Sequence, residues 1–387
     1  MMPTGHLEKR YKSSWTIVIE LDRDPVTGKR KRITKSVKGT KKEAEKEMVR
    51  MLNELERGTY VEPSGMTVGE YLLHWLEAYC KPNLAPKTLQ SYSYIIHQHL
   101  IPALGHIKLD KLQPLHLQEY YSKALQSGRK DGKGGLSLRS VQYHHRILHE
   151  ALGHALKWQL VHRNVAEAVE APRYKRPDVK ALSPEEVNKL LAKAKEINHP
   201  DYALLVTAVY TGMRQGELLG LRWQDIDMTA GVAYVRQILQ KLPGQPVMFK
   251  EPKTQAGKRQ VVLSPAVIDI LKAAKKQQAE NRLRLGQAYQ DYGLVFCREN
   301  GLPLDPFTVT HRFKKLAKLA GFPELRFHDL RHTHATLLLA QGVHPKVVQE
   351  RLGHRSITLT LDTYSHVLPT LQKEAAAKVE EALKHSK

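Results

Sequence analysis

Residues 326–366 read RFHDLRHTHATLLLAQGVHPKVVQERLGHRSITLTLDTYSH, and this stretch decides the fold of the C-terminal part of the chain. His328 and Arg331 are one helical turn apart, so they lie on one face if FHDLRHTHATLLLAQG forms a helix. Gly342 predicts a turn after that helix, and Pro345 begins a short second helix. Local chain reversals therefore bring polar side chains of this stretch together.

The second half of the stretch adds His354, directly after Gly353, and then Tyr364. Cations, imidazoles and a phenol in one place suit a phosphodiester, whose non-bridging oxygens gain negative charge in the transition state and accept paired hydrogen bonds from guanidinium groups. A phenol with a pKa near ~10 becomes a nucleophile at neutral pH only when cations and a base lower that value. Each residue alone would more often pack or cap, but their joint spacing favours phosphate chemistry.

A second block, YTGMRQGELLGLRWQDID at residues 210–227, agrees with the first. Together the two blocks resemble the signature of the tyrosine recombinase, or phage integrase, family, and they occur in the expected order. In this resemblance Arg214 stands where the first phosphate-clamping arginine belongs, and Glu217 follows one turn later to support it. The resemblance implies a mostly helical, mixed α+β catalytic domain.

The family's roles carry over residue by residue. Arg214, Arg331 and His354 are expected to hold the scissile phosphate. Tyr364 attacks that phosphate, forms a 3′-phosphotyrosyl bond and frees a 5′ hydroxyl, while His328 assists as base or hydrogen-bond donor. The covalent bond conserves the energy of the phosphodiester, so the resemblance implies recombination without a metal or other cofactor. The sequence agrees, because it contains no P-loop and no obvious carboxylate cluster of the two-metal type.

A lysine in KEPKTQAGKR, residues 250–259, is expected to protonate the departing 5′ oxygen. The setting of Lys253 resembles that of the family's general acid, and Lys250 and Lys258 are its rivals. The flanking segments VAYVRQIL and QVVL are predicted strands. Helices are predicted at residues 265–286 and 306–320.

The composition favours a polyanionic partner. Sixty-one Lys and Arg against 39 Asp and Glu give the 387-residue chain a formal net charge of +22, and double-stranded DNA suits such an excess. No run approaches the ~18 apolar residues of a membrane-spanning helix, and the N-terminus lacks the apolar core of a signal peptide. We therefore expect a cytoplasmic protein with no membrane partner. Cys80 and Cys297 suggest neither a disulfide framework nor a zinc module.

Residues 1–62 are predicted to form a small domain of a strand hairpin, which a third strand could extend, and one helix. Residues 15–21 alternate as a half-buried strand should, and Thr40 with Glu43 forms a capping box for the helix. The arrangement resembles the arm-binding domain of phage and conjugative-transposon integrases. Residues 28–42 carry eight Lys or Arg and no acid. The expected DNA contacts there are Lys29, Arg30, Lys31, Arg32, Lys35 and Lys38.

Residues 66–172 are predicted to form four amphipathic helices. They begin near Thr67, Pro86, Pro114 and Ser137. In the family this position holds the helical, SAM-like core-binding domain.

Residues 173–182 are predicted to be a basic linker without periodicity, with Lys175 and Arg176 as further DNA contacts. Ser183 and Glu186 then cap the first helix of the catalytic domain, residues 183–387. The expected architecture is thus multidomain and mainly α.

The last helix, TLQKEAAAKVEEALKHS, carries an apolar face. In relatives such a tail docks on a neighbouring protomer, so the resemblance implies a homotetramer on DNA. That tetramer would exchange strands through a Holliday junction while it integrates or excises a phage or mobile element at attachment sites. DNA-bending and directionality proteins are the accessory partners that such a system implies.

Two other functions stay open. A type IB topoisomerase-like enzyme would relax DNA with similar chemistry, and a DNA-binding protein could keep the fold without cutting. The basic N-terminal domain and the two blocks favour an integrase over the first, and the retention of every expected catalytic residue disfavours the second. His328 and His332 are spaced like zinc ligands in HExxH, but Asp329 and Arg331 fit such a site poorly.

Overall fold

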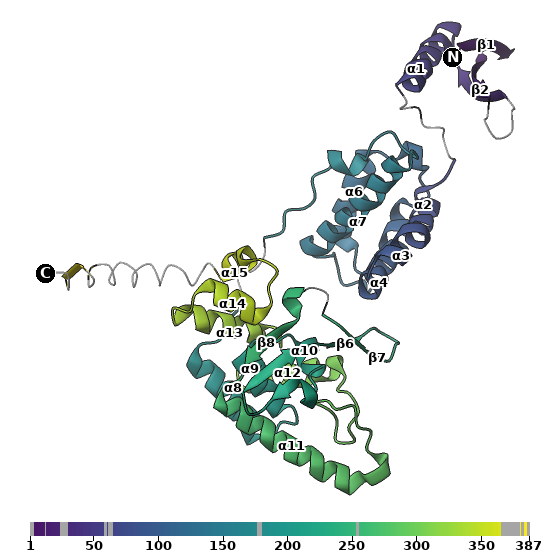
Figure 1. Cartoon of the computed structure of the whole chain (residues 1–387). Coiled ribbons are helices and arrows are strands. Elements are labelled where there is room, and N and C mark those ends of the chain that lie inside the picture. Colours follow the sequence, from purple (N-terminus) through teal and green to yellow (C-terminus); the bar gives the residue numbers. More distant parts are fainter. Residues whose placement is uncertain are drawn as a thin grey trace. The chain divides into compact units, whose positions relative to one another are not determined.

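The computed structural model describes residues 4–11, 13–23, 30–57, 60, 65–175, 180–252, 255–364, 380 and 383–384, with the backbone alone at 22, 23, 30, 255, 359 and 362–364. The chain divides into two compact units, residues 1–176 and 177–387 (Figure 1). This division falls inside the predicted linker. The boundaries of the three predicted domains stay a prediction.

The N-terminal unit begins with a three-stranded antiparallel sheet in the order β1-β2-β3. Its strands are β1 (Thr4–Tyr11), β2 (Ser14–Arg23) and β3 (Arg30–Lys38), and helix α1 (Lys41–Glu56) follows them. The third strand thus precedes the predicted hairpin. Thr40 and Glu43 form the predicted capping box. Ile17, Ile19 and Ile33 of the sheet pack with Met51 of α1.

The rest of the unit is helical, with four long segments as predicted. The first runs through α2 (Val68–Trp75), η1 (Leu76–Cys80) and α3 (Lys81–Asn83), and the second through α4 (Pro86–Ile95), η2 (Ile96–Leu100) and α5 (Ile101–Leu104). The third and fourth are α6 (Pro114–Ser127) and α7 (Leu138–Lys157), and short helices lie at η3 (Leu109–Lys111) and η4 (Val165–Ala168). Tyr71, Trp75, Leu100, Leu117 and Ile147 contribute to one apolar core.

The C-terminal unit is mixed α+β. Its helices are α8 (Pro184–Glu196), α9 (Tyr202–Thr211), α10 (Gln215–Leu219), η5 (Trp223–Asp225), η6 (Gln255–Gly257), α11 (Pro265–Leu285), η7 (Gly286–Ala288), α12 (Pro306–Leu319), α13 (Asp329–Ala340), α14 (Pro345–Leu352) and α15 (Ile357–Tyr364). Strands β4 (Ile226–Asp227), β5 (Val232–Val235) and β8 (Arg259–Val262) form one antiparallel sheet, while β6 (Ile238–Lys241) and β7 (Val247–Lys250) form another. The predicted mainly α, multidomain fold class is confirmed.

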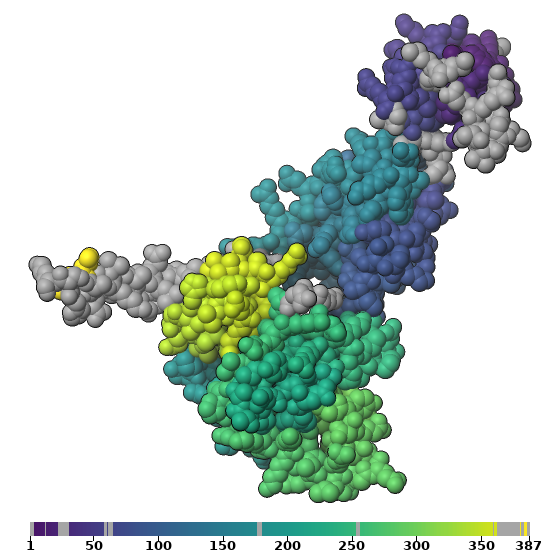
Figure 2. Space-filling view, viewed as in Figure 1, coloured from purple at the N-terminus to yellow at the C-terminus, as the bar shows by residue number. Residues whose placement is uncertain are grey.

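Helix α9 lies at the centre of this unit, because seven of its ten residues are buried. It packs against α8, α11 and α13, while α14 contacts β8. Figure 2 shows the yellow residues of α13 to α15 lying against the green residues of the strand region. The two sequence blocks singled out above therefore meet in one place.

The strand prediction for VAYVRQIL needs a correction. The segment divides between β5 and β6, which belong to different sheets. Gly244, with φ 73°, lies between β6 and β7, and these two strands pair as a hairpin that was not predicted. The helices predicted at 265–286 and 306–320 are confirmed as α11 and α12. Within the described part of the chain, no helix is long and apolar enough to cross a membrane.

Candidate active site

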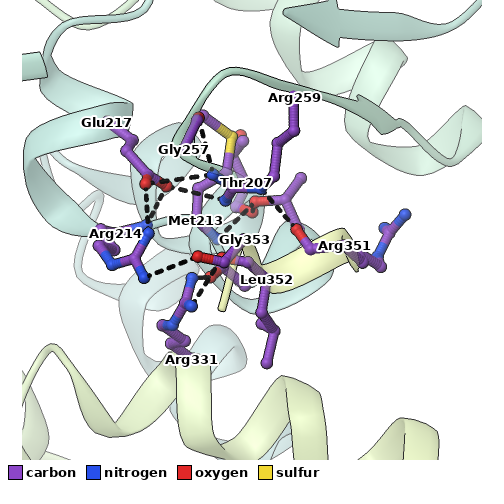
Figure 3. Close-up of polar contacts among 12 residues, drawn as sticks. Thr207, Met213, Arg214, Glu217, Gly257, Arg259, Arg331, Arg351, Leu352 and Gly353 are labelled. Atoms are coloured by element: carbon purple, nitrogen blue, oxygen red, sulfur yellow. Dashed lines mark hydrogen bonds and ion pairs between the residues drawn. The ribbon is translucent and has the colours of Figure 1, made fainter. Parts of the chain in front are cut away.

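Three successive backbone carbonyls at the C-terminal end of α14 each accept a hydrogen bond from a different arginine (Figure 3). The pairs are Arg259 with the carbonyl of Arg351 (2.7 Å), Arg331 with that of Leu352 (2.7 Å) and Arg214 with that of Gly353 (3.2 Å). The last carbonyls of a helix have no partner within the helix and carry the negative end of its dipole. The end of α14 therefore gathers guanidinium groups from three other parts of the chain.

Gly353 allows this helix end to approach the β7–β8 loop. Its φ is 67°, a left-handed conformation that L side chains rarely adopt. A Cβ atom there would lie 2.6 Å from the carbonyl oxygen of Ala256 and 2.9 Å from a guanidinium nitrogen of Arg259. The close approach that positions Arg259 thus requires glycine.

Arg214 is the N-cap residue of the short helix α10, and Glu217 lies in the first turn of that helix. One oxygen of Glu217 accepts from Nη1 of Arg214 at 2.7 Å, and the other accepts from the backbone N–H of Arg214 at 2.9 Å. The Arg214 side chain is 40% exposed, whereas that of Glu217 is 3% exposed. The buried carboxylate of Glu217 therefore holds Arg214 in place, and part of the Arg214 guanidinium stays accessible to solvent.

Arg259, the first residue of β8, forms a two-bond ion pair with the same carboxylate. Its Nη1 and Nη2 donate to the two oxygens of Glu217 at 3.2 and 2.9 Å. Burial raises the pKa of the Glu217 carboxyl, but the hydrogen bonds and charge of Arg259, together with Arg214, outweigh burial and lower the pKa to about 2. The carboxylate is therefore ionised at neutral pH and holds two arginines.

Arg331 extends from α13 and is only 3% exposed. Besides its bond to Leu352, it donates through Nη1 to the carbonyl of Gly212 at 2.8 Å. Gly212 ends α9 with φ 63°, so Arg331 joins the end of α9 to the end of α14. In the first turn of α13, the buried Asp329 forms an ion pair with Arg326.

His354 follows the helix end and is 8% exposed. Its Nδ1 lies 2.8 Å from the hydroxyl of Thr360 in α15, and its backbone carbonyl accepts from the amide of Gln349 at 2.8 Å. Burial lowers the pKa of His354 to about 3, and the charges of Arg331 and Arg214 act in the same direction. The imidazole is therefore neutral at physiological pH.

His328 lies at the N-terminus of α13, next to the arginines. Desolvation lowers its pKa, and Arg331 lowers it further. Its ring meets that of His332 edge to face, with centroids 5.0 Å apart. A neutral His328 can accept a proton, as a general base must.

The charges of this site suit an anion. Arg214, Arg259 and Arg331 bring three guanidinium groups to one helix end, and Glu217 neutralises only one of these charges. Two neutral imidazoles, His328 and His354, complete the cluster. Fixed donors of this kind stabilise the charge that develops on a phosphoryl group in the transition state.

Comparison with protein families agrees with this geometry. The profile described as "Phage integrase family" matches residues 180–370, and the profile "Phage integrase, N-terminal SAM-like domain" matches residues 67–125. The chain belongs to the phage integrase family. It is a tyrosine-type site-specific recombinase, and the prediction drawn from the two sequence blocks is confirmed.

Curated relatives resemble this integrase over most of its length. A "Tyrosine recombinase XerC-like" protein of Caldanaerobacter subterraneus subsp. tengcongensis is 29% identical over 358 residues, which are 87% of this chain and 88% of the relative. The ICEBs1 integrase of Bacillus subtilis is 26% identical over 377 residues, or 97% of this chain and 100% of the relative.

Solved integrase structures share the fold. The Tn1549 transposon integrase, in complex with a circular intermediate DNA, matches with a TM-score of 0.66 and 22% identity. The match spans 77% of this chain and 95% of the transposon integrase chain. A lambda integrase tetramer bound to a Holliday junction has a TM-score of 0.59 at 20% identity and covers 92% of this chain and 94% of its own.

The structure brings together five residues that the sequence predicted for the integrase site: Arg214, Glu217, His328, Arg331 and His354. Tyr364 is the last residue of α15, the helix that carries Thr360. The backbone alone is described there, so the predicted position of its phenol stays a prediction.

The predicted general acid, Lys253, lies outside the described residues. Its rival Lys258 forms an ion pair with Glu251 at 2.6 Å. Lys250 ends β7 and is half-buried. All three lysines lie in the sequence segment 250–258 that precedes Arg259, and the choice among them stays a prediction.

The residues of the N-terminal unit that were predicted to contact DNA differ in exposure and in ion pairing. Lys31, Lys38 and Lys175 are exposed, and Arg32 is exposed and pairs with Glu20. Lys35 pairs with Glu47 of α1 at 2.7 Å and so ties the strand to the helix. Lys29 and Arg176 lie outside the described residues, and Arg30 is described by its backbone alone. The role of these residues stays a prediction.

Sequence reasoning missed Arg259, Arg351 and Thr360. Arg351 donates through Nε to the buried His334 and through Nη2 to the carbonyls of Tyr210 and Val262, so it anchors α14. A carboxylate has more acceptor sites than Arg214 alone can fill, which implies a further donor but does not identify Arg259. Nothing in the local sequence pointed to Thr360.

Proposed function

We propose that this integrase cleaves and rejoins double-stranded DNA at attachment sites through a covalent bond between Tyr364 and a 3′ phosphate. The phenolic oxygen of Tyr364 attacks the scissile phosphorus, and the bond from phosphorus to the 5′ oxygen breaks. A 5′ hydroxyl of the partner strand then attacks the phosphotyrosine, forms a new bond to phosphorus and releases Tyr364 as a free phenol. The observation that carries this proposal is the set of arginines fixed on the end of α14.

Arg214 and Arg331 form the phosphate clamp, and they differ in exposure and therefore in role. The partly exposed Arg214 offers its remaining N–H groups to a non-bridging oxygen, and the buried Arg331 supplies fixed positive charge behind the phosphate. When the hydroxyl of Thr360 donates to Nδ1 of His354, the neutral imidazole carries its proton on Nε2 and donates that proton to the phosphate. Preorganised donors such as these accelerate phosphoryl transfer.

Proton transfer completes the reaction. His328, whose pKa is lowered, accepts the phenolic proton or holds it in a hydrogen bond. Lys253 gives a proton to the departing 5′ oxygen, which leaves as a hydroxyl. The reverse step returns both protons, so the cycle consumes no external energy source.

We further propose that the enzyme acts as a homotetramer on DNA and exchanges strands through a Holliday junction. The lambda integrase tetramer on such a junction, which shares this fold, supports the assembly. The exposed lysines of β3 support additional DNA contacts by the N-terminal unit. Integration or excision of a mobile element, with DNA-bending and directionality proteins as partners, is the corresponding biological role. Because cellular DNA is the substrate, the reaction takes place in the cytoplasm.

A suicide substrate tests the chemistry. Purified protein is mixed in EDTA with a nicked duplex that carries a candidate attachment site, and the products are separated on a denaturing gel. The proposal expects a covalent protein–DNA band for the wild type and for Tyr292→Phe, an exposed control tyrosine in the same unit. It expects no band for Tyr364→Phe. A band that persists in Tyr364→Phe would overturn the proposal.

A further inference from the structure

Arg259 joins three parts of the chain that lie far apart in the sequence. It begins β8 after the lysine-bearing loop, it pairs with Glu217 of α10, and it donates to the carbonyl of Arg351 at the end of α14 (Figure 3). Its side chain is 7% exposed. Each of its three guanidinium nitrogens already donates to a protein acceptor, Nη1 also to the carbonyl of Gly257. Arg259 is therefore poorly placed to contact DNA itself.

The charge of Arg259 changes what Arg214 can do. Without Arg259, Arg214 and the buried Glu217 would form a pair with no net charge, and the attraction of this pair for a phosphate would be weak. With Arg259, the three groups together carry one positive charge, and the exposed one of the two arginines is Arg214. Arg259 thus compensates the supporting carboxylate and leaves Arg214 cationic toward the ligand.

Arg259 also fixes the position of the lysine-bearing loop. Its contact with Arg351 and the close approach of Gly353 to the carbonyl of Ala256 hold the end of this loop on the end of α14. The same helix end anchors Arg214 and Arg331. One side chain therefore holds the described end of this loop, at Ala256 and Arg259, beside the arginines of the phosphate clamp.

We propose that Arg259 is a positioning residue for strand cleavage, which sets the charge and orientation of Arg214 through Glu217 and aligns the lysine-bearing loop with α14. This role rests on the proposed function. Loss of Arg259 slows the chemical step and leaves DNA binding nearly intact. Its guanidinium is buried on protein acceptors, and the affinity for site DNA is spread over many phosphate contacts.

The test compares Arg259→Gln and Arg259→Lys with the wild type in single-turnover cleavage of the nicked substrate. Arg282→Gln serves as control, because Arg282 forms an exposed ion pair with Asp291 in the same unit. We expect Arg259→Gln to cleave about 100-fold more slowly, the cost of a misplaced catalytic group. Arg259→Lys should not restore the rate, because the donors of an ammonium share one nitrogen and cannot span the acceptors that Nε, Nη1 and Nη2 of the arginine reach separately. The Kd for site DNA should stay within about twofold, and Arg282→Gln should match the wild type.

Two further readouts separate positioning from general stability. In a double-mutant cycle with Glu217→Gln, the double variant should cleave nearly as fast as the slower single variant, because both changes break one unit. Arg259→Lys should also lose cleavage more steeply than the wild type on acidification between pH 7 and 5. In this variant Glu217 keeps Arg214 but loses the paired hydrogen bonds of Arg259. These bonds oppose the effect of burial, so the pKa of Glu217 should rise toward the assayed range.

Several outcomes would overturn the proposal. The first is that a folded Arg259→Gln cleaves within about threefold of the wild-type rate. The second is that the losses in the double-mutant cycle add, and the third is that a fall in DNA affinity accounts for the lost rate. If Arg259→Gln does not fold, judged by circular dichroism, Arg259→Lys decides by the same criteria. If the wild type itself forms no covalent product, the proposed function fails instead, so the two failures are distinct.

Discussion

His354 and Thr360 are both buried, and the imidazole Nδ1 of the histidine lies 2.8 Å from the hydroxyl of the threonine. This contact joins the residue after the α14 end to α15, the helix that ends at Tyr364. One hydrogen bond thus orients the imidazole that is predicted to bind the phosphate and fixes it to the helix of the predicted nucleophile.

Replacement of Thr360 by valine removes the hydroxyl and keeps the shape. We expect Thr360→Val to cleave suicide substrate about tenfold more slowly, since a lost buried hydrogen bond of about 1.4 kcal/mol corresponds to that factor. Thr360→Ser retains the hydroxyl and should stay close to wild type. Equal rates for the valine and serine variants would show that the hydroxyl does not orient His354.

Gly353→Ala should damage the site through backbone strain and a collision together. The added methyl group would meet the carbonyl of Ala256 at 2.6 Å in a residue with φ 67°. Gly342→Ala is the matched control, because Gly342 has φ 74° and open space around it. We expect the control to cost about 1–2 kcal/mol of strain alone, and Gly353→Ala to cost more and to abolish most cleavage. Thermal melting and the gel assay measure the two effects, and equal losses in both variants would contradict this account.

Glu217→Gln removes a buried charge that neutralises its surroundings. We expect it to lower the free energy of unfolding by about 3–5 kcal/mol, the usual cost of leaving a buried partner unpaired. Glu299→Gln is the control, since Glu299 forms an exposed pair with Arg284 and should cost less than about 1 kcal/mol. Urea unfolding measures the free energy of unfolding of both variants. A similar loss in the two would show that the ion pairs of Glu217 do not stabilise the fold more than an exposed pair does.

Acidification should loosen the segment around α13 and α14. Burial lowers the pKa of His334 to about 3, with Arg351 contributing, and burial likewise lowers that of His354 to about 3. At a pH between these lowered values and the ordinary pKa of histidine, the unfolded chain binds more protons than the folded chain. The stabilisation is therefore complete above the ordinary pKa and is lost progressively as the pH falls below it. We expect a loss of about 1–2 kcal/mol per imidazole between pH 7 and 5.

Hydrogen exchange of peptides from these helices measures that loss. His334→Phe removes one titrating group and should reduce the pH dependence by the corresponding amount. Protection that stays constant from pH 7 to 5 would show that these imidazoles do not couple to local unfolding.

The sequence predicted those parts of the site that follow from local spacing. Arg331 and His328 share one helical turn, and Glu217 follows Arg214 by one turn, so their proximity needed only a helix. The capping boxes at Thr40, Thr67 and Ser183 were also readable, because a cap and its partner are three residues apart.

Contacts between distant segments were beyond such reasoning. Arg259 meets the carbonyl of Arg351 across 92 residues of sequence, and Arg214 meets that of Gly353 across 139. Both acceptors are backbone carbonyls, which every residue type possesses, so no side-chain pattern marks them. The split between β5 and β6 was missed for a related reason. VAYVRQIL reads as one strand, and only the different pairing partners of its two halves divide it.

The central claim is that Tyr364 carries the DNA through a 3′ phosphate, and peptide mapping of the covalent adduct tests it most directly. The adduct is formed in EDTA on a strand labelled at its 5′ end, and the label is located on a denaturing gel. The DNA of an unlabelled adduct is then trimmed with nuclease, and the protein is digested with trypsin. Tryptic cleavage after Arg355 and Lys373 gives the peptide SITLTLDTYSHVLPTLQK, which contains a single tyrosine. The account predicts that the label stays with the protein and that the nucleotide mass lies on Tyr364. A nucleotide on another peptide, or a label that remains with the free DNA, would contradict it.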